Sequence, residues 1–160
     1  MIEKLFTIGV YGRTESEFFA KIEAAHIDTF CDIRQRRAVR GAEYAFVNSN
    51  RLQAALAARG IAYLHVLALA PTTEMREAQY KVDEKAGISK RARQVLGDVF
   101  KQKYSKQILG KFDSKAFSAS LPPSSRHMVL FCAEAAPAAC HRSLVAERLE
   151  KDWKVSVEHL

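Results

Sequence analysis

Five chemically reactive side chains lie within eleven residues in the last third of the chain. They are Cys132, Glu134, Cys140, His141 and Arg142. A thiol can act as a nucleophile, a carboxylate and an imidazole can transfer protons, and a guanidinium can bind an anion. The segment follows a short apolar run and precedes an amphipathic stretch, and α/β proteins commonly build a site at such a junction between a strand and a helix.

Cys140 is the strongest candidate nucleophile in this segment. It falls at or just before the first turn of a predicted helix, where the helix dipole and unpaired backbone N–H groups favour a thiolate. Packing beneath the helix is the other interpretation of Cys140, and packing at a strand end is the simpler interpretation of Cys132. Cys140 and His141 are therefore candidate catalytic residues, and Cys132 is a candidate substrate contact.

Glu134 follows the same predicted strand and has two interpretations. It could act as a general acid or base, which makes it a third candidate catalytic residue, or it could form a bidentate ion pair with Arg142. Arg142 and Ser143 at a helix start also suit a phosphate or carboxylate. The segment has neither the glycine and lysine frame of a Walker loop nor the Cys-x5-Arg spacing of phosphatases, so it predicts an anion site of another kind.

Cys132, Cys140 and His141 also have side chains that bind zinc. The seven residues between the two cysteines match none of the close spacings that identify zinc sites, so we expect no metal and no cofactor. A divalent ion held by Glu134 and Asp32 is a weaker option. The third cysteine, Cys31, lies in an apolar run and is expected to be a buried packing residue.

The elements that must position these residues alternate between strands and helices. Strands are predicted over 5–10, 27–33, 61–69, 128–132 and 154–159, and helices over 15–25, 49–59 and 141–152. Thr14 and Glu17 form a capping box before the first helix. Residues 74–120 are predicted to be a basic helical segment, in which an apolar stripe from Val95 to Ile108 indicates one long helix. This order predicts a single three-layer, Rossmann-like α/β domain over residues 1–160, with a mainly parallel sheet, helices on both faces and a central third strand.

Ligands of such folds bind outside the carboxyl ends of the strands. Polar or reactive residues end or follow three of the first four predicted strands: Tyr11, Arg13, Asp32, Arg34, Cys132 and Glu134. The remaining strand of these four, over 61–69, carries Tyr63 and His65 within it. Asp32 and Arg34 share one face of their strand, where they could pair with each other or contact a ligand. His65 and Tyr63 also share a face and have core packing as the other interpretation. Together these strand ends predict one substrate-binding crevice.

Positive charge is concentrated in two parts of the chain. Residues 76–115 carry a net charge of +6 out of +7 for the whole chain, and four arginines lie between Arg34 and Arg40. Such clusters favour an anionic small molecule or a nucleic acid as partner. The other interpretation is a basic surface that is only solvated and binds no anion. The start lacks the features of a signal peptide and no run is long enough to span a membrane, so we expect a cytoplasmic protein with no membrane partner.

The chain resembles a family of bacterial proteins across nearly its whole length. The resemblance is carried by Thr7-Ile-Gly9, Ile27 to Arg34, Gly60 to His65, and most specifically Cys132-Ala-Glu134 followed by Cys140-His-Arg-Ser143. These segments are similar to the family grouped as domain of unknown function 488 (DUF488). The chain differs from the family pattern at Val10-Tyr11 and at Leu69-Ala70-Pro71. The resemblance implies an α/β fold with a shared pocket and leaves the reaction open.

Two classes of function agree with these patterns. In the first, the protein is a cysteine- or carboxylate-dependent hydrolase or transferase acting on a phosphate-bearing substrate, with a nucleotide or nucleic acid favoured. In the second, it is a non-catalytic module that binds a nucleotide or nucleic acid. A Cys140 thiolate that titrates well below a free thiol favours the enzyme, whereas a buried, inert thiol favours the module.

Overall fold

The sheet has five strands that all run in the same direction, in the order β3-β2-β4-β1-β5. The computed structural model describes all residues from 1 to 160. The strands are β1 (Lys4–Ile8), β2 (Thr29–Asp32), β3 (Ala62–His65), β4 (His127–Phe131) and β5 (Ser156–His159). The predicted parallel sheet is therefore confirmed; β4 has its predicted length, shifted by one residue, and the other four strands are shorter than predicted.

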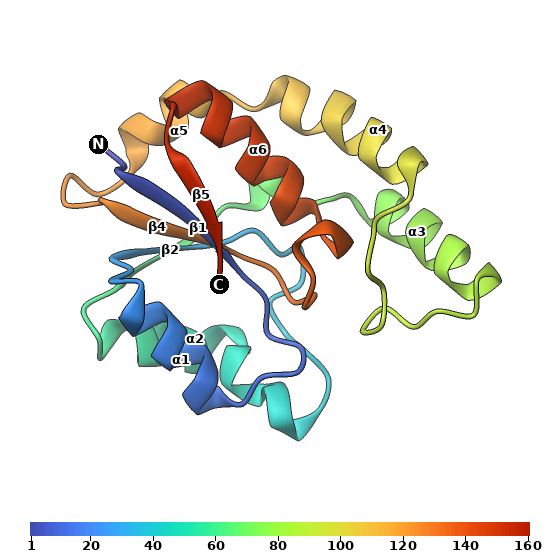
Figure 1. Cartoon of the computed structure of the whole chain (residues 1–160), viewed down its shortest axis with the longest axis horizontal. Coiled ribbons are helices and arrows are strands. Elements are labelled where there is room, and N and C mark those ends of the chain that lie inside the picture. The colour runs from blue at the N-terminus through green and yellow to red at the C-terminus, as the bar shows by residue number, and fades with distance from the viewer.

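Helices cover both faces of this sheet, which confirms the three layers (Figure 1). On one face lie α1 (Glu15–Ala24) and α2 (Ser49–Ala57), and on the other lie α6 (His141–Trp153) and α5 (Ser114–Ser120). The buried apolar residues form two clusters, one for each face. Phe18 and Leu52 represent the first cluster, and Val145 and Leu149 the second. Each face is covered because α1 and α2 on one side and α6 on the other bury apolar side chains against the strands.

The helix α1 shows how closely local sequence signals can place an element. Its N-cap is Thr14, whose side chain accepts a hydrogen bond from the Glu17 backbone N–H, while the Glu17 carboxylate accepts one from the Thr14 backbone N–H. The predicted capping box is therefore confirmed. It fixes the start of α1, and the buried Phe18, Phe19 and Ile22 fix its orientation.

The third strand differs from its prediction in length and position. We expected a central strand over 61–69, but β3 pairs only with β2, lies at the edge of the sheet and ends at His65. A short 3-10 helix follows over Leu67–Leu69, in which Leu67 is exposed and Leu69 is buried. The apolar run is long because it contains an edge strand and a separate turn that anchors in the core.

The basic segment is helical in three parts, α3 (Thr73–Lys85), α4 (Asp98–Gln107) and α5, and the chain between α3 and α4 is not helical. The helix predicted from the stripe over 95–108 is α4, which begins three residues later than expected. Gly97 is the N-cap of α4, and the Leu96 N–H donates to the Ala138 carbonyl instead of continuing a helix. Val95 and Val99 of the predicted stripe are exposed. None of the helices of the protein combines the length and the apolar composition needed to cross a membrane.

The topology places a switch point between β1 and β4. These strands are neighbours in the sheet. The chain runs from β1 to β2 on one side of this pair and from β4 to β5 on the other side. Ligands of open α/β sheets bind in the crevice beyond such a point. Gly9 lies there, and a Cβ at this residue would lie 2.0 Å from the Glu134 carbonyl oxygen. Only glycine allows the segments after β1 and β4 to approach so closely.

Candidate active site

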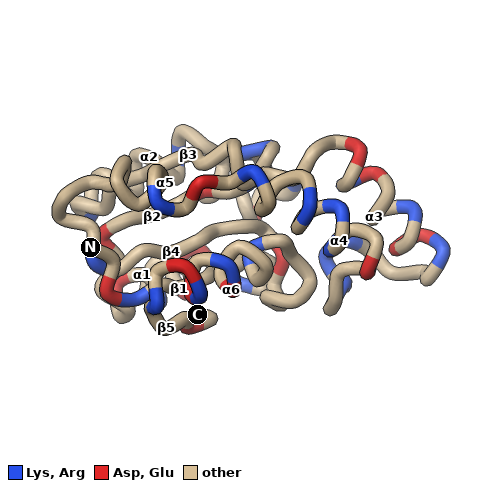
Figure 2. Tube along the Cα trace, turned by 90° about the horizontal axis from the view of Figure 1, so that it is seen from above, with Lys and Arg blue, Asp and Glu red and all other residues tan.

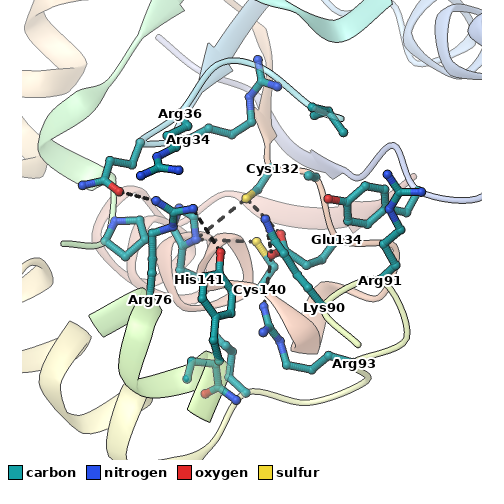
Figure 3. A pocket seen from close by; sticks show the side chains of 18 of the residues that line it. Arg34, Arg36, Arg76, Lys90, Arg91, Arg93, Cys132, Glu134, Cys140 and His141 are labelled. Carbon is teal, nitrogen blue, oxygen red and sulfur yellow. Dashed lines mark hydrogen bonds and ion pairs between the residues drawn. The ribbon is translucent and has the colours of Figure 1, made fainter. Parts of the chain in front are cut away.

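A cavity of about 530 Å³ opens at the carboxyl edge of the sheet (Figure 3). Its walls come from the loop after β2, from α3 and from the chain between α3 and α4, and its floor comes from the segments after β4 and before α6. Seven cationic side chains line it: Arg34, Arg36, Arg40, Arg76, Lys90, Arg91 and Arg93. The single acidic residue is Glu134. The cavity is therefore strongly electropositive.

Two thiols and one imidazole meet at the floor of this cavity. The Nδ1 atom of His141 lies 3.6 Å from the Cys140 sulfur and 3.9 Å from the Cys132 sulfur. The other ring nitrogen, Nε2, lies 2.9 Å from the Ile33 carbonyl oxygen. A carbonyl only accepts hydrogen bonds, so Nε2 carries a proton, and in the neutral ring Nδ1 is a free acceptor that faces both sulfurs. The ring can therefore take a proton from a thiol or bind a metal ion through Nδ1.

Glu134 is a buried carboxylate held by two cations. Its Oε1 atom lies 3.1 Å from Arg93 and 3.7 Å from Lys90, and its Oε2 atom accepts a hydrogen bond of 3.1 Å from the Cys132 thiol. Burial alone would raise the pKa of Glu134, but Lys90, the Cys132 thiol and Arg93 outweigh it and lower the pKa to about 2. Glu134 is therefore ionised at neutral pH.

The Cys132 thiol behaves differently from a free thiol. The neighbouring Cys140 sulfur, burial and the Glu134 carboxylate all raise the pKa of Cys132 well above its usual value. Without a cation at the sulfur, Cys132 is thus a neutral thiol that donates to Glu134. Cys140 is the N-cap of α6, as predicted, and its sulfur accepts the backbone N–H of Arg142 at 3.5 Å.

Arg93 links this floor to α3, although the sequence did not single it out. It is buried, and its three donor groups bind the Ala139 carbonyl at 3.0 Å, Asp83 at 2.6 Å and Glu134 at 3.1 Å. Asp83 is also buried and accepts from Gln79. Arg93 therefore fixes the carboxylate of Glu134 and the loop before α6 in one network.

Arg34 is held in a fixed orientation at the wall of the cavity. Its guanidinium pairs with both oxygens of Asp32 at 2.8 and 2.7 Å and stacks on the Phe131 ring, with 4.6 Å from the guanidinium carbon to the ring centroid. Its Nη1 atom has no hydrogen-bond partner. Tyr63 donates to Asp32, and the Nε2 of His65 donates to the Arg34 carbonyl. Burial, followed by the charge of Asp32, raises the pKa of Tyr63 to about 12.

The predicted site residues thus occupy three kinds of position. Six of them line the cavity: Tyr11, Arg34, Cys132, Glu134, Cys140 and His141. The other three in this region do not line the cavity but hold Arg34: Asp32 pairs with its guanidinium, Tyr63 donates to Asp32, and His65 donates to the Arg34 carbonyl. The carboxylate of Asp32 is fully occupied by Arg34 and Tyr63, so the structure gives no shared ion site with Glu134.

Arg142, Ser143 and Arg13 do not line the cavity. Arg142 is buried and donates to the carbonyls of Glu134 and Ala135. Ser143 donates to the Cys140 carbonyl at 3.0 Å, and Arg13 donates to the carbonyls of Gly9 and Leu160. All three side chains hold loops around the site through backbone carbonyls.

Four cationic lining residues were not recognised individually from the sequence: Arg76, Lys90, Arg91 and Arg93. Their only signal was membership of the basic segment. Arg91 bridges the rim, because it donates to the Arg40 carbonyl at 2.6 Å and lies over the Tyr11 ring at 5.2 Å. Part of the basic segment therefore forms the cavity wall.

Fold and site together define a parallel α/β protein with a cationic cavity above a cysteine–histidine–glutamate floor. A family model described as domain of unknown function DUF488 matches residues 15–149. The match covers most of the chain, so the protein belongs to this family. No curated protein and no solved structure matches the chain.

Proposed function

We propose that this protein is an enzyme that acts on a phosphate-bearing substrate, with a nucleotide or nucleic acid as the favoured class. The observation that carries the proposal is the cationic lining of the cavity. Three of its seven cations, Arg36, Arg40 and Arg76, have no acidic partner within ion-pair distance. An anionic substrate would supply the missing charge, and phosphate is an anion that guanidinium groups bind in bidentate fashion.

Reacting groups lie directly below these cations. Cys140, His141 and Glu134 are the centre at which the chemistry takes place in this proposal, and Cys132 borders it. Arg34 supports substrate binding because its guanidinium is oriented before any ligand arrives. A preorganised cation loses little freedom on binding, so more of the interaction energy is available for holding the phosphate.

The aromatic and apolar part of the lining favours a nucleotide over inorganic phosphate. Tyr11, Tyr80 and Phe100 share the cavity with the cations. Nucleobases stack on aromatic rings and arginine planes, and such a contact is worth about 1–3 kcal/mol for each base. A cavity that combines phosphate-binding cations with ring surfaces therefore suits a substrate with both parts.

Arg36→Ala tests substrate binding most directly. Arg36 is exposed, lines the cavity and makes no ion pair, so its loss should leave the fold intact. A hydrogen bond to a charged group contributes about 1.5–3 kcal/mol, so calorimetric titration with nucleoside monophosphates should give about tenfold weaker binding or worse. Arg51→Ala is the matched control, because Arg51 is an exposed arginine of α2 outside the cavity.

Two results would contradict the proposal. If both variants bind a nucleotide as the wild type does, the cavity is not the phosphate site. If nucleotides and oligonucleotides bind but chromatography shows no conversion of any of them, the protein is a binding module and not an enzyme. Conversion that disappears in Cys140→Ser, with the circular dichroism spectrum unchanged, supports the enzyme.

A further inference from the structure

The three donors at the cavity floor have the separations of a metal site. His141 Nδ1 lies 3.6 Å from the Cys140 sulfur and 3.9 Å from the Cys132 sulfur, and all three donor atoms lie within 4.8 Å of one another. With Zn–S bonds of about 2.3 Å and Zn–N bonds of about 2.0–2.1 Å, a tetrahedral zinc ion requires about 3.6 Å between sulfur and nitrogen and about 3.8 Å between two sulfurs. Small side-chain rotations would bring the donors to these values.

The surroundings of the donors are those of metal ligands. Histidine ligands nearly always donate their second ring nitrogen to a carbonyl or carboxylate, and His141 Nε2 donates to the Ile33 carbonyl at 2.9 Å. The Cys140 sulfur accepts a backbone N–H at the start of α6, which stabilises its negative charge. Two of the three donors are therefore already oriented by the backbone.

The chemistry of the donor set selects the kind of metal. Two thiolates and one imidazole suit Zn²⁺, whereas Mg²⁺ and Ca²⁺ prefer oxygen ligands. All three residues are buried, so a dication would neutralise two thiolates that otherwise could not both be charged there. They form the only cluster of three or more potential metal ligands in the protein.

The position of the cluster indicates an open coordination site. Cys132, Cys140 and His141 all line the cavity, so a fourth ligand can enter from it. Catalytic zinc sites have three protein ligands, two cysteines and one histidine among the known sets, and keep the fourth position for water or substrate. Structural zinc sites are instead closed by four protein ligands.

We propose that Cys132, Cys140 and His141 bind one zinc ion whose fourth position opens into the cationic cavity. The zinc site itself is independent of the proposed function, and only the phosphate-bearing substrate is taken from it. A metal at this place would act as a Lewis acid toward an oxygen of the phosphate that the cavity cations hold. Cys140 and His141 then serve the reaction as ligands, and Glu134 lies beside the metal as a carboxylate fixed by Arg93.

The test is the metal content of the full-length protein, purified without chelators and without a metal-binding tag. Plasma mass spectrometry should find one zinc per chain. Cys132→Ser and Cys140→Ser should each weaken zinc binding by at least about 100-fold. Loss of a residue that only hydrogen-bonds to a metal ligand costs about 10–100-fold in metal affinity, and loss of the ligand itself should cost more. Cys31→Ala is the matched control, because Cys31 is equally buried but lies outside the cluster.

A measurement on the wild-type protein keeps the test independent of how the variants fold. Zinc is removed with phenanthroline and replaced by Co²⁺. Strong visible bands and sulfur-to-cobalt charge-transfer bands are expected for a tetrahedral site with two thiolates. Zinc below a tenth of an equivalent in both the purified and the zinc-reconstituted protein, or the weak spectrum of octahedral cobalt, would overturn the proposal. Equal loss of zinc from the Cys31 variant would do the same.

Nucleotide binding by the metal-free protein separates this inference from the proposed function. If the protein binds nucleotides but no zinc, only the metal site is wrong. If it binds zinc but neither form binds a phosphate-bearing ligand, the metal site stands and the proposed substrate class is wrong.

Discussion

Arg34 and Arg142 are two buried arginines that the fold uses in different ways. Each has one guanidinium nitrogen without a hydrogen-bond partner, Nη1 in Arg34 and Nε in Arg142. Arg142 directs its other donors to carbonyls of its own loop, whereas Arg34 lines the cavity and is paired with Asp32. An arginine beside a strand end is therefore a ligand-binding candidate only when its charge reaches the cavity.

Arg93 should contribute strongly to stability, because it is a buried cation with two buried acidic partners. Arg93→Ala would leave the buried Asp83 without a cation and Glu134 with Lys90 alone, and breaking a buried ion pair costs about 3–5 kcal/mol. Urea unfolding should show this loss. Arg51→Ala, which removes an exposed ion pair with Glu15, should cost less than about 1 kcal/mol. Equal midpoints for the two variants would show that the buried network does not stabilise the protein.

The site was predictable from the sequence where its residues are close in the chain or lie at a predicted strand end, as Tyr11 and Arg34 do. Cys132, Glu134, Cys140 and His141 stood out because the chain leaves a strand and enters a helix within a few residues. Arg93 could not be distinguished from the other cations of its segment, since its burial depends on Asp83 and Glu134, which lie 10 and 41 residues away. The expectation of no metal rests on spacing rules for short loops, whereas the proposed zinc site rests on donors that a strand end and a helix start bring together in space.

At the scale of elements, hydrogen-bonding signals were more reliable than apolar runs. The capping box of Thr14 and Glu17 placed the start of α1 correctly. The apolar stripe from Val95 placed the start of α4 too early, because tertiary contacts of Gly97 and Leu96 replace the first expected turn. Periodicity reports which side chains could share a face, whereas a cap reports where the backbone must change direction.

Thr14→Ala tests the contribution of this cap. The substitution removes the acceptor of the Glu17 N–H and should lower the free energy of unfolding by about 1 kcal/mol, the usual value for an N-cap threonine. Denaturant titration followed by circular dichroism measures the change. Ser16→Ala, an exposed substitution within α1, is the control and should change stability by less than about 0.5 kcal/mol. A Thr14 variant as stable as this control would show that packing alone fixes α1.

At the scale of the whole molecule, the positive charge continues beyond the cavity. The helices α3 and α4 lie together at one end of the protein, where Figure 2 shows Lys and Arg mixed with Asp and Glu. The positive surplus of this basic end lies on α4, which has three lysines and one aspartate, whereas α3 has more acidic than basic residues. Lys101 and Lys106 of α4 are not part of the cavity lining. A mononucleotide would contact the cavity cations alone, whereas a nucleic acid could also cross this basic end.

Salt dependence distinguishes these two substrate classes. Each phosphate in contact with a single-stranded ligand adds about 0.7 to the slope of log K against log salt concentration. We expect a steeper slope for a short single-stranded oligonucleotide than for a nucleoside monophosphate, measured by fluorescence anisotropy and calorimetry. The double variant Lys101→Gln and Lys106→Gln should reduce the oligonucleotide slope and leave the mononucleotide slope unchanged, because neither lysine lines the cavity. Equal slopes for the two ligands in the wild type would restrict the substrate to a small nucleotide, because the basic end would then make no phosphate contacts.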